Sequence, residues 1–371
     1  MILPIIILVP AAALLAVVAW NVLAWPKVNP RARAYPQSVS VLIPARNEEG
    51  NLAACLEAVL RQGEAIAEVL IYNDHSTDST ARIIAEFARR DGRVRLVEAV
   101  PLAPGWCGKN FACVQLAEAA RGEWLLFLDA DVRLADGAVD QMVEEAHRRE
   151  LTFLSCWPAL SLVGFWEKAL MPMLNFVVFT LFPAPLSLRR PWPSLGIAHG
   201  ACLLMHRIQY AAIGGHAAVR DQIFEDVRLA QLWRARGERG LCLDGQEVVS
   251  VRMYSSPGEI WSGFQKNCFL AFRRELSFWA FLALHGVVFL APFLALAWIR
   301  AWPVWLAAGS VLGMRALLAL RFRYPWWSVL LHPLGEMVLI AIGLSSWWRC
   351  KSGRGVEWKG RQYYARGSDY L

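Results

Sequence analysis

Residues 124–132 read WLLFLDADV, an apolar run that ends in two aspartates, Asp129 and Asp131, separated by one residue. A short run of this composition predicts a buried β-strand. In α/β sheets, ligands bind just beyond the carboxyl ends of the strands. Two carboxylates spaced in this way suit a hard divalent cation, Mg²⁺ or Mn²⁺, bridging a diphosphate. A helix cap or a solvated loop would use the same residues, so the pattern alone leaves both interpretations open.

Other short strands precede this one, and each is followed by an amphipathic helical stretch. The strand and helix pairs are Val39–Pro44 with Glu48–Arg61, Glu68–Tyr72 with Thr77–Arg90, and Arg93–Glu98 with Lys109–Arg121. This alternation predicts a mostly parallel sheet covered by helices. Residues 38–250 are enough for one α/β domain of this kind.

The polar residues at the strand ends predict a nucleotide site. Asp74 lies at the tip of the second strand, as Asp129 does at the end of its own, so both are expected over the same sheet edge. The first strand leads into a helix N-terminus, which suits the polar edge of a nucleotide. We expect Asp74 to bind base or ribose, while Ser76 or Thr77 caps the next helix.

The composition indicates a membrane protein. Of 371 residues, 56% are hydrophobic and 19% charged, and there are 18 tryptophans, a residue enriched at bilayer surfaces. This argues against an ordinary soluble enzyme, a disordered chain or a disulfide scaffold. The net charge of +7 comes from scattered basic residues beside apolar runs, which favours anionic lipid over nucleic acid. The eight cysteines show no metal-binding spacing and are expected to be buried thiols.

The apolar runs predict where the chain meets the bilayer. Residues 1–26 form an N-terminal transmembrane anchor, and Lys27, Arg31 and Arg33 after it place this end in the cytoplasm. Residues 276–348 contain two or three further helices, of which the Pro303/Arg315 run is a candidate for re-entry, and residues 349–371 form a basic tail. The proline-broken segment 165–192 is expected to lie on the bilayer surface.

Four motifs together resemble the nucleotide-sugar half of a family 2 glycosyltransferase with the GT-A fold. They are PARNEE at 44–49, NDHSTD at 73–78, GKNFA at 108–112 and LDADV at 128–132. The match continues through FED at 224–226, HPL at 332–334 and WKGRQY at 358–363. This longer pattern is similar to bacterial membrane enzymes that glycosylate carotenoid acids, of the diaponeurosporenoate type, and to hopanoid-associated relatives.

The resemblance implies a role for each matching residue. Ala45, Arg46 and Glu48 would line the nucleobase pocket, Asp74 would contact base or ribose, Lys109 would approach the nucleotide, and Asp129 and Asp131 would be the metal-binding pair. Asp226 of the Glu225-Asp226 pair would be the general base of an inverting transfer. Without the resemblance, Lys109 reads equally well as a surface lysine, and Asp226 as a helix N-terminal charge.

Some positions depart from the family pattern or are less telling. Processive relatives carry Gln-x-x-Arg-Trp, but Gln265 here has no Arg-Trp after it, which favours transfer of a single sugar over polymer synthesis. His199 and His216 are expected to be core or loop histidines. His332 and Glu336, one helical turn apart in an apolar run, are either functional or hydrogen-bonded to each other.

The expected activity is therefore metal-dependent transfer of one hexose, glucose from UDP-glucose, to a membrane lipid by a multi-pass cell-membrane protein with a cytoplasmic catalytic domain. A carotenoid is the first acceptor considered and a hopanoid the second. A polyprenyl-phosphate acceptor stays open because of Arg189 and Arg190. A non-catalytic scaffold that binds nucleotide sugars is the alternative from a different class. The sequence does not predict an oligomeric state.

Overall fold

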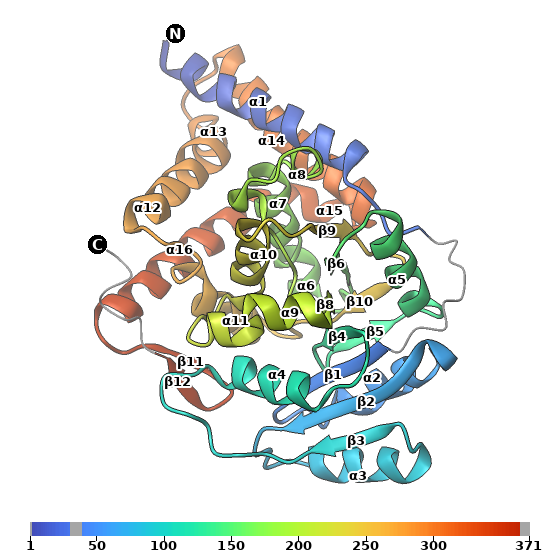
Figure 1. Ribbon diagram of the computed structural model, residues 1–371. Helices are drawn as coiled ribbons and strands as arrows, with labels where there is room; N and C mark the ends of the chain where they lie inside the picture. The colour runs from blue at the N-terminus through green and yellow to red at the C-terminus, as the bar shows by residue number, and fades with distance from the viewer. Residues whose placement is uncertain (1, 30–38, 364–371) are drawn as a thin grey trace. The chain divides into compact units, whose positions relative to one another are not determined.

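The computed structural model describes residues 2–29 and 39–363; Arg31, Arg33 and the tail beyond residue 363 lie outside these ranges. The chain folds into two compact units, a sheet unit and a helical unit (Figure 1). The sheet unit consists of Pro26–Ser161 and Leu186–Met253. The helical unit consists of Met1–Trp25, Leu162–Pro185 and Tyr254–Leu371.

A seven-stranded mixed sheet forms the centre of the sheet unit, which confirms the predicted α/β class. Its strands, in spatial order, are β3 (Val94–Val97), β2 (Ile66–Asn73), β1 (Val39–Ala45), β4 (Trp124–Leu128), β8 (Cys202–His206), β6 (Phe153–Trp157) and β9 (Gly240–Asp244). Strands β3, β2, β1 and β4 are parallel, whereas β8 runs antiparallel to both of its neighbours. A smaller sheet joins β5 (Val132–Leu134), β10 (Val249–Val251) and β7 (Ala159–Leu160).

Helices cover both faces of the large sheet (Figure 1). Alternate residues of β1 supply the two cores: Val41 and Ile43 face one, and Leu42 faces the other. The first core includes α2 (Leu52–Leu60), α3 (Thr80–Arg90) and α5 (Ala138–Arg148). The second includes α4 (Gly108–Ala119), α9 (Arg207–Ile213) and α10 (Glu225–Ala235). Because the sheet is buried on both faces, its strands are apolar along their length.

The strand register gathers the polar segments at one edge of the sheet. Ala45, the last residue of β1, pairs with Asn73, the last residue of β2. Leu128, the last residue of β4, pairs with Cys202, the first residue of antiparallel β8. The turns after β1, β2 and β4 and the segment just before β8 therefore all lie at this edge.

The helical unit contains the apolar helices. Within the described residues, three helical stretches are long and apolar enough to cross a bilayer: Ile5–Ala24 of α1 (Ile2–Ala24), Glu275–Ala295, and α14 (Trp302–Phe322). The second consists of α12 (Glu275–Leu284), a π-helical turn η4 (His285–Leu290) and α13 (Ala291–Ala295). The Pro303/Arg315 run is one unbroken helix, because Pro303 lies in its first turn, where no intrahelical N–H bond is lost.

The remaining helices of this unit are shorter or more polar. They are α6 (Phe165–Leu170), α7 (Pro172–Leu181), α11 (Pro257–Cys268), α15 (Trp327–Leu330) and α16 (His332–Lys351). A short hairpin pairs β11 (Val356–Trp358) with β12 (Arg361–Tyr363). The prolines of the 165–192 segment divide it into short helices, since Pro172 begins α7 and α8 (Ala184–Ser187) follows Pro183.

Some buried polar side chains of the helical unit bond to one another or to open backbone groups. Asn21 of α1 is buried; its amide donates to the carbonyl oxygens of Phe179 and Phe182 and accepts from the N–H of Ala184. Glu336 Oε2 lies 2.8 Å from His285 Nδ1, and Glu336 Oε1 lies 3.4 Å from His332 Nε2. His332 and Glu336, the two polar residues noted in this apolar run, therefore lie in one buried polar group with His285.

Candidate active site

Asp129 and Asp131 lie in the turn between β4 and β5, at the polar edge of the sheet. The Asp129 N–H donates to the carbonyl oxygen of Ala201, just before β8, and its carbonyl oxygen accepts from the N–H of Val132. Beneath the turn, the Cys55 Sγ lies 3.8 Å from the Asp129 carbonyl oxygen, and burial raises the pKa of this thiol to about 12. The backbone of the turn is therefore held on both sides, and the thiol below it is inert.

Lys109 carries the positive charge of the site. Its Nζ lies 2.7 Å from Asp129 Oδ1 and 3.0 Å from Glu225 Oε1. Burial opposes the charge on Lys109, but the carboxylates of Asp129 and Glu225 outweigh it and raise the pKa of the ammonium well above its ordinary value. Lys109 is thus a fixed cation and not the surface lysine that the sequence left open.

The first turn of α4 is fixed by Asn110, the residue after Lys109. The buried Asn110 amide donates to the carbonyl oxygens of Val219 and Gln222, in and after the turn η3 (Gly215–Val219). The N–H of Cys107 donates to the carbonyl oxygen of Arg220 in the same loop. The loop that leads to Asp226 is therefore tied directly to the helix that carries Lys109.

Asp226 lies in the first turn of α10, where the helix dipole favours a negative charge. Its Oδ1 accepts from the N–H of Val227 at 2.7 Å, and its Oδ2 accepts from the N–H of Gly200 at 2.7 Å. Burial and then the charge of Glu225 raise the pKa of Asp226 to about 7, although Lys109 and the two N–H groups oppose the shift. A carboxylate with a pKa near neutrality suits a general base.

The segment that contains His199 and Gly200 lies between Asp129 and Asp226 and bonds to both. A Cβ atom on Gly200 would lie 3.2 Å from Asp226 Oδ2 and 3.4 Å from Lys109 Nζ, so both groups face this glycine. The Nδ1 of His199 accepts from the N–H of Ala201, which leaves the proton on Nε2 in the neutral ring. Burial lowers the pKa of His199 to about 4, although Asp129 opposes the shift, so the ring is a neutral donor at pH 7.

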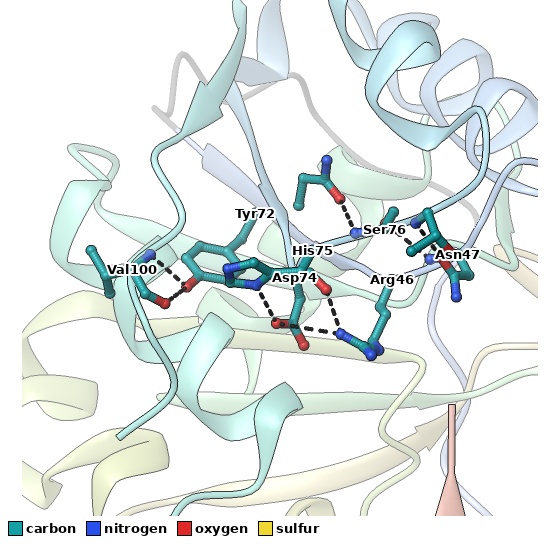
Figure 2. A network of polar contacts seen from close by, with 9 residues as sticks. Arg46, Asn47, Tyr72, Asp74, His75, Ser76 and Val100 are labelled. Atoms are coloured by element: carbon teal, nitrogen blue, oxygen red, sulfur yellow. Dashed lines mark hydrogen bonds and ion pairs between the residues drawn. The ribbon is translucent and has the colours of Figure 1, made fainter. Parts of the chain in front are cut away.

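The turns after β1 and β2 form the other part of the site (Figure 2). The Arg46 guanidinium donates to the carbonyl oxygen of Asp74 at 2.8 Å and lies 4.0 Å from Asp74 Oδ1. The Asn47 N–H donates to Ser76 Oγ, and the Thr77 N–H donates to Asn47 Oδ1. Asn47 and His75 both have left-handed backbone angles, with φ of 52° and 54°. The two turns thus form one rigid bracket that holds Arg46 beside the Asp74 carboxylate.

Ala45 and Glu48 belong to the same bracket in different ways. Ala45 is buried at the end of β1, and its carbonyl oxygen accepts from the N–H of Asp74. The N–H of Glu48 donates to Thr80 Oγ1, and its carboxylate accepts from the Asn51 amide. Ala45 therefore contributes its backbone carbonyl group to the bracket, whereas Glu48 hydrogen-bonds the residues at the start of α2.

Some residues that the sequence singled out have structural roles outside this site. His216 is a core residue, as expected: it is fully buried, hydrogen-bonds Tyr210 at 2.9 Å and packs on Phe127 of β4. Gln265 donates to Ser345 within the helical unit. From the sequence, Glu225 had no role of its own and His199 was expected to be a core or loop histidine. The features that could have marked them as site residues are the position of Glu225 beside Asp226 and that of His199 three residues before β8.

Residues 40–214 match the family described as Glycosyl transferase family 2. Proteins from Staphylococcus aureus named 4,4'-diaponeurosporenoate glycosyltransferase are 26% identical over 343 residues, which is 88% of this chain and of theirs. The bovine-strain sequence is 27% identical over 351 residues.

A solved structure supports the fold. A mannosyltransferase from Pyrobaculum calidifontis, determined with GDP-Man and Mn²⁺, superposes with a TM-score of 0.56 at 20% identity, covering 93% of this chain and 99% of its own. The sheet unit therefore has the GT-A fold. The family match and the named relatives identify the chain as a glycosyltransferase. It contains a glycosyl transferase family 2 domain, and its resemblance to the carotenoid-acid enzymes is confirmed over most of its length.

Proposed function

We propose that this chain transfers one hexose from a nucleotide sugar, UDP-glucose first among the candidates, to a lipid acceptor, with inversion at the anomeric carbon. The observation that carries the proposal is the position of Asp226. Its carboxylate is fixed by two N–H bonds, has a pKa near 7 and lies across Gly200 from Lys109. A protein that only binds nucleotide sugars has no need of such a base.

The donor binds along the polar edge of the sheet. Arg46 and Asp74 contact the nucleoside, and the ammonium of Lys109 is available to the diphosphate. His199 Nε2–H adds a neutral donor next to Asp129. Each of these groups is already held by a bond to the backbone or by an ion pair, so little reorganisation precedes the reaction.

A divalent metal fits the carboxylates of Asp129 and Asp131. Both residues offer hard oxygen ligands of the kind that Mg²⁺ and Mn²⁺ prefer. Within residues 2–29 and 39–363, no cluster of three or more histidine, cysteine or carboxylate side chains is arranged to hold a metal. The other ligands would therefore be diphosphate oxygens and water. When bound, the cation supplies charge neutralisation for the departing nucleoside diphosphate.

The transfer itself is a single displacement. The acceptor oxygen forms a bond to the anomeric carbon while the bond from this carbon to the diphosphate oxygen breaks, so the configuration inverts. Where the acceptor is a hydroxyl group, its proton passes to the Asp226 carboxylate; where it is a carboxylate, no proton moves. Lys109 balances the negative charge that develops on the leaving diphosphate.

The proposed acceptor is a membrane lipid, with a carotenoid acid or alcohol first and a hopanoid second. Support comes from the three helices long enough to cross a bilayer and from the names of the Staphylococcus aureus relatives. The cytoplasmic orientation of the sheet unit and the surface position of residues 165–192 belong to the same proposal. A polyprenyl phosphate is the alternative acceptor, because the exposed Arg189 and Arg190 could bind its phosphate group.

The test compares membranes that carry wild type, Asp226→Asn or the exposed control Asp136→Asn. Each is incubated with Mg²⁺, UDP-glucose and a pigment-containing lipid extract, and lipids that gain one hexose are identified by mass spectrometry. We expect wild type and Asp136→Asn to hexosylate hydroxyl acceptors and Asp226→Asn not to do so. Equal product from Asp226→Asn at a hydroxyl acceptor would remove the base assignment, and UDP binding with no product from any common nucleotide sugar would favour the scaffold.

A further inference from the structure

Seven consecutive residues of the sheet unit, Leu188–Ser194, are all exposed and form what we call the 188–194 loop. Its sequence, LRRPWPS, combines two arginines with a tryptophan and a leucine that are 50% and 42% exposed. The Arg190 guanidinium lies over the Trp192 ring, 5.6 Å from its centroid. Exposed apolar and basic side chains in one short loop are typical of segments that meet a lipid headgroup layer.

One buried arginine holds the backbone of this loop. Arg234 of α10 is only 7% exposed, and its guanidinium donates to four carbonyl oxygens, those of Ser187, Arg190, Trp192 and Gly240. Burial lowers the pKa of Arg234, and the four hydrogen bonds offset part of the cost of taking its charge out of water. Two loop carbonyls, those of Arg190 and Trp192, and the carbonyl of Ser187 just before the loop are therefore bonded from inside, and the side chains of Leu188, Arg189, Arg190 and Trp192 are exposed.

The same segment continues along α10 to the active site. Gly196 packs so closely on α10 that a Cβ atom would lie 2.6 Å from the Gln231 N and 2.7 Å from the Ala230 carbonyl carbon. Four residues later the Gly200 N–H donates to Asp226. Asp226 and Arg234 are eight positions apart, about 12 Å along one helix. The loop and the proposed base are thus attached to opposite ends of the same rigid element.

We propose that the 188–194 loop is a docking surface for acidic phospholipid headgroups, with Arg189 and Arg190 binding phosphate and Leu188 and Trp192 entering the interface. Charge complementarity identifies the partner: a guanidinium pair beside exposed apolar residues matches an anionic bilayer surface better than a neutral one. Because the loop is bound to α10, docking fixes the height of the Asp226 end of this helix above the lipid.

The test uses the full chain in nanodiscs and does not require turnover. Ser194→Cys is labelled with the environment-sensitive dye NBD in a Cys268→Ser, Cys350→Ser background, because the other six cysteines are buried. Emission is compared in discs of neutral phosphatidylcholine and in discs that also contain phosphatidylglycerol. We expect a blue shift with phosphatidylglycerol that high salt reverses.

A matched arginine pair provides the control. Arg89 and Arg90 are also adjacent and exposed in the sheet unit, and Arg90 lies over the Phe87 ring. We expect Arg89→Gln/Arg90→Gln to keep the shift and Arg189→Gln/Arg190→Gln to lose it, since each arginine near an acidic surface strengthens association about fivefold. Identical spectra in both kinds of disc would overturn the proposal, as would a shift that requires a polyprenyl phosphate and ignores phosphatidylglycerol. Neither result depends on hexose transfer.

Discussion

The ammonium nitrogen of Lys109 lies 2.7 Å from Oδ1 of Asp129, so the first carboxylate of the Asp-x-Asp pair is ion-paired to the first turn of α4. The same nitrogen reaches Glu225 at 3.0 Å. Lys109 therefore links the turn after β4 to the first turn of α10, and through Gly200 it borders on Asp226. This relationship makes several outcomes predictable.

Replacing Lys109 with Gln should lower kcat/KM for the nucleotide sugar by about a hundredfold, the usual cost of losing one preorganised electrostatic group. The variant should stay folded, because the side chain is 36% exposed and the remaining carboxylates can be hydrated. Steady-state kinetics and thermal unfolding are measured on the same preparation. Glu118→Gln, on the exposed side of α4, is the control; an unchanged kcat/KM in Lys109→Gln would contradict the role of this ammonium.

Activity should rise with pH through about 7. The pKa of Asp226 is raised to about 7 by burial and by Glu225, so the carboxylate is protonated below this pH and accepts a proton only above it. For a hydroxyl acceptor, kcat/KM should follow the ionised fraction of one group. A flat profile between pH 5.5 and 8.5 would show that Asp226 does not take a proton in the rate-limiting step.

The same pKa predicts a gain in stability when Asp226 is replaced with Asn. The folded-state pKa of about 7 lies above the unfolded value of 3.8, so the free energy of unfolding falls as the pH rises from about 3.8 to 7 and stays at its lower value above pH 7. Asp226→Asn should therefore melt at a higher temperature than wild type at pH 8, with a smaller difference at pH 5. Tm values from differential scanning fluorimetry decide this, and a lower Tm for the variant at pH 8 would be contrary to it.

Gly200→Ala should reduce activity while leaving the fold intact. The added Cβ would lie 3.2 Å from Asp226 Oδ2, so the carboxylate must shift by a few tenths of an ångström, and 3.4 Å from Lys109 Nζ, which is contact distance. Displacements of this size at a reacting centre lower kcat. Gly92→Ala, where the Cβ meets nothing within 4 Å, should have wild-type activity. Equal kcat for the two variants would rule out a tight contact at Gly200.

Glu336→Leu should destabilise the helical unit, because it leaves buried His285 without its 2.8 Å partner. An unsatisfied buried polar group costs about 1–3 kcal/mol in unfolding free energy. Unfolding in detergent should show the loss, and the exposed neighbour Met337→Ala serves as control. A double-mutant cycle with His285→Leu should give a coupling of about 0.6 kcal/mol, the average for such pairs in membrane proteins; zero coupling would mean that the two side chains act independently.

The sequence predicted the parallel half of the sheet well, because each apolar strand is followed directly by its covering helix. It placed the helix starts too early: Glu48 and Thr77 were expected in helices that begin at Leu52 and Thr80. Residues 46–51 and 74–79 instead bond across to each other, and a contact between turns about thirty residues apart leaves no local period in the sequence.

The site was predictable only where a motif marks it. Asp129, Asp131 and Asp226 stand in recognisable strings, whereas His199 and Gly200 reach the site because β8 runs antiparallel and starts opposite the end of β4. Strand direction is set by tertiary pairing and cannot be predicted from the local β-propensity of the residues. The same holds for Arg234, an ordinary helix residue in the sequence, because three of its four carbonyl partners lie more than forty positions away.

The chain leaves the sheet unit at Ser161 and returns to it at Leu186, and the excursion between them contains the backbone groups that bond Asn21 of the first helix. This order has a consequence for biogenesis. The ribosome delivers Asp129 and Asp131 before the excursion and Asp226 after it, so the carboxylate pair and the proposed base join the nascent chain in separate stretches of synthesis. The complete set of site residues therefore exists only after the excursion has been synthesised.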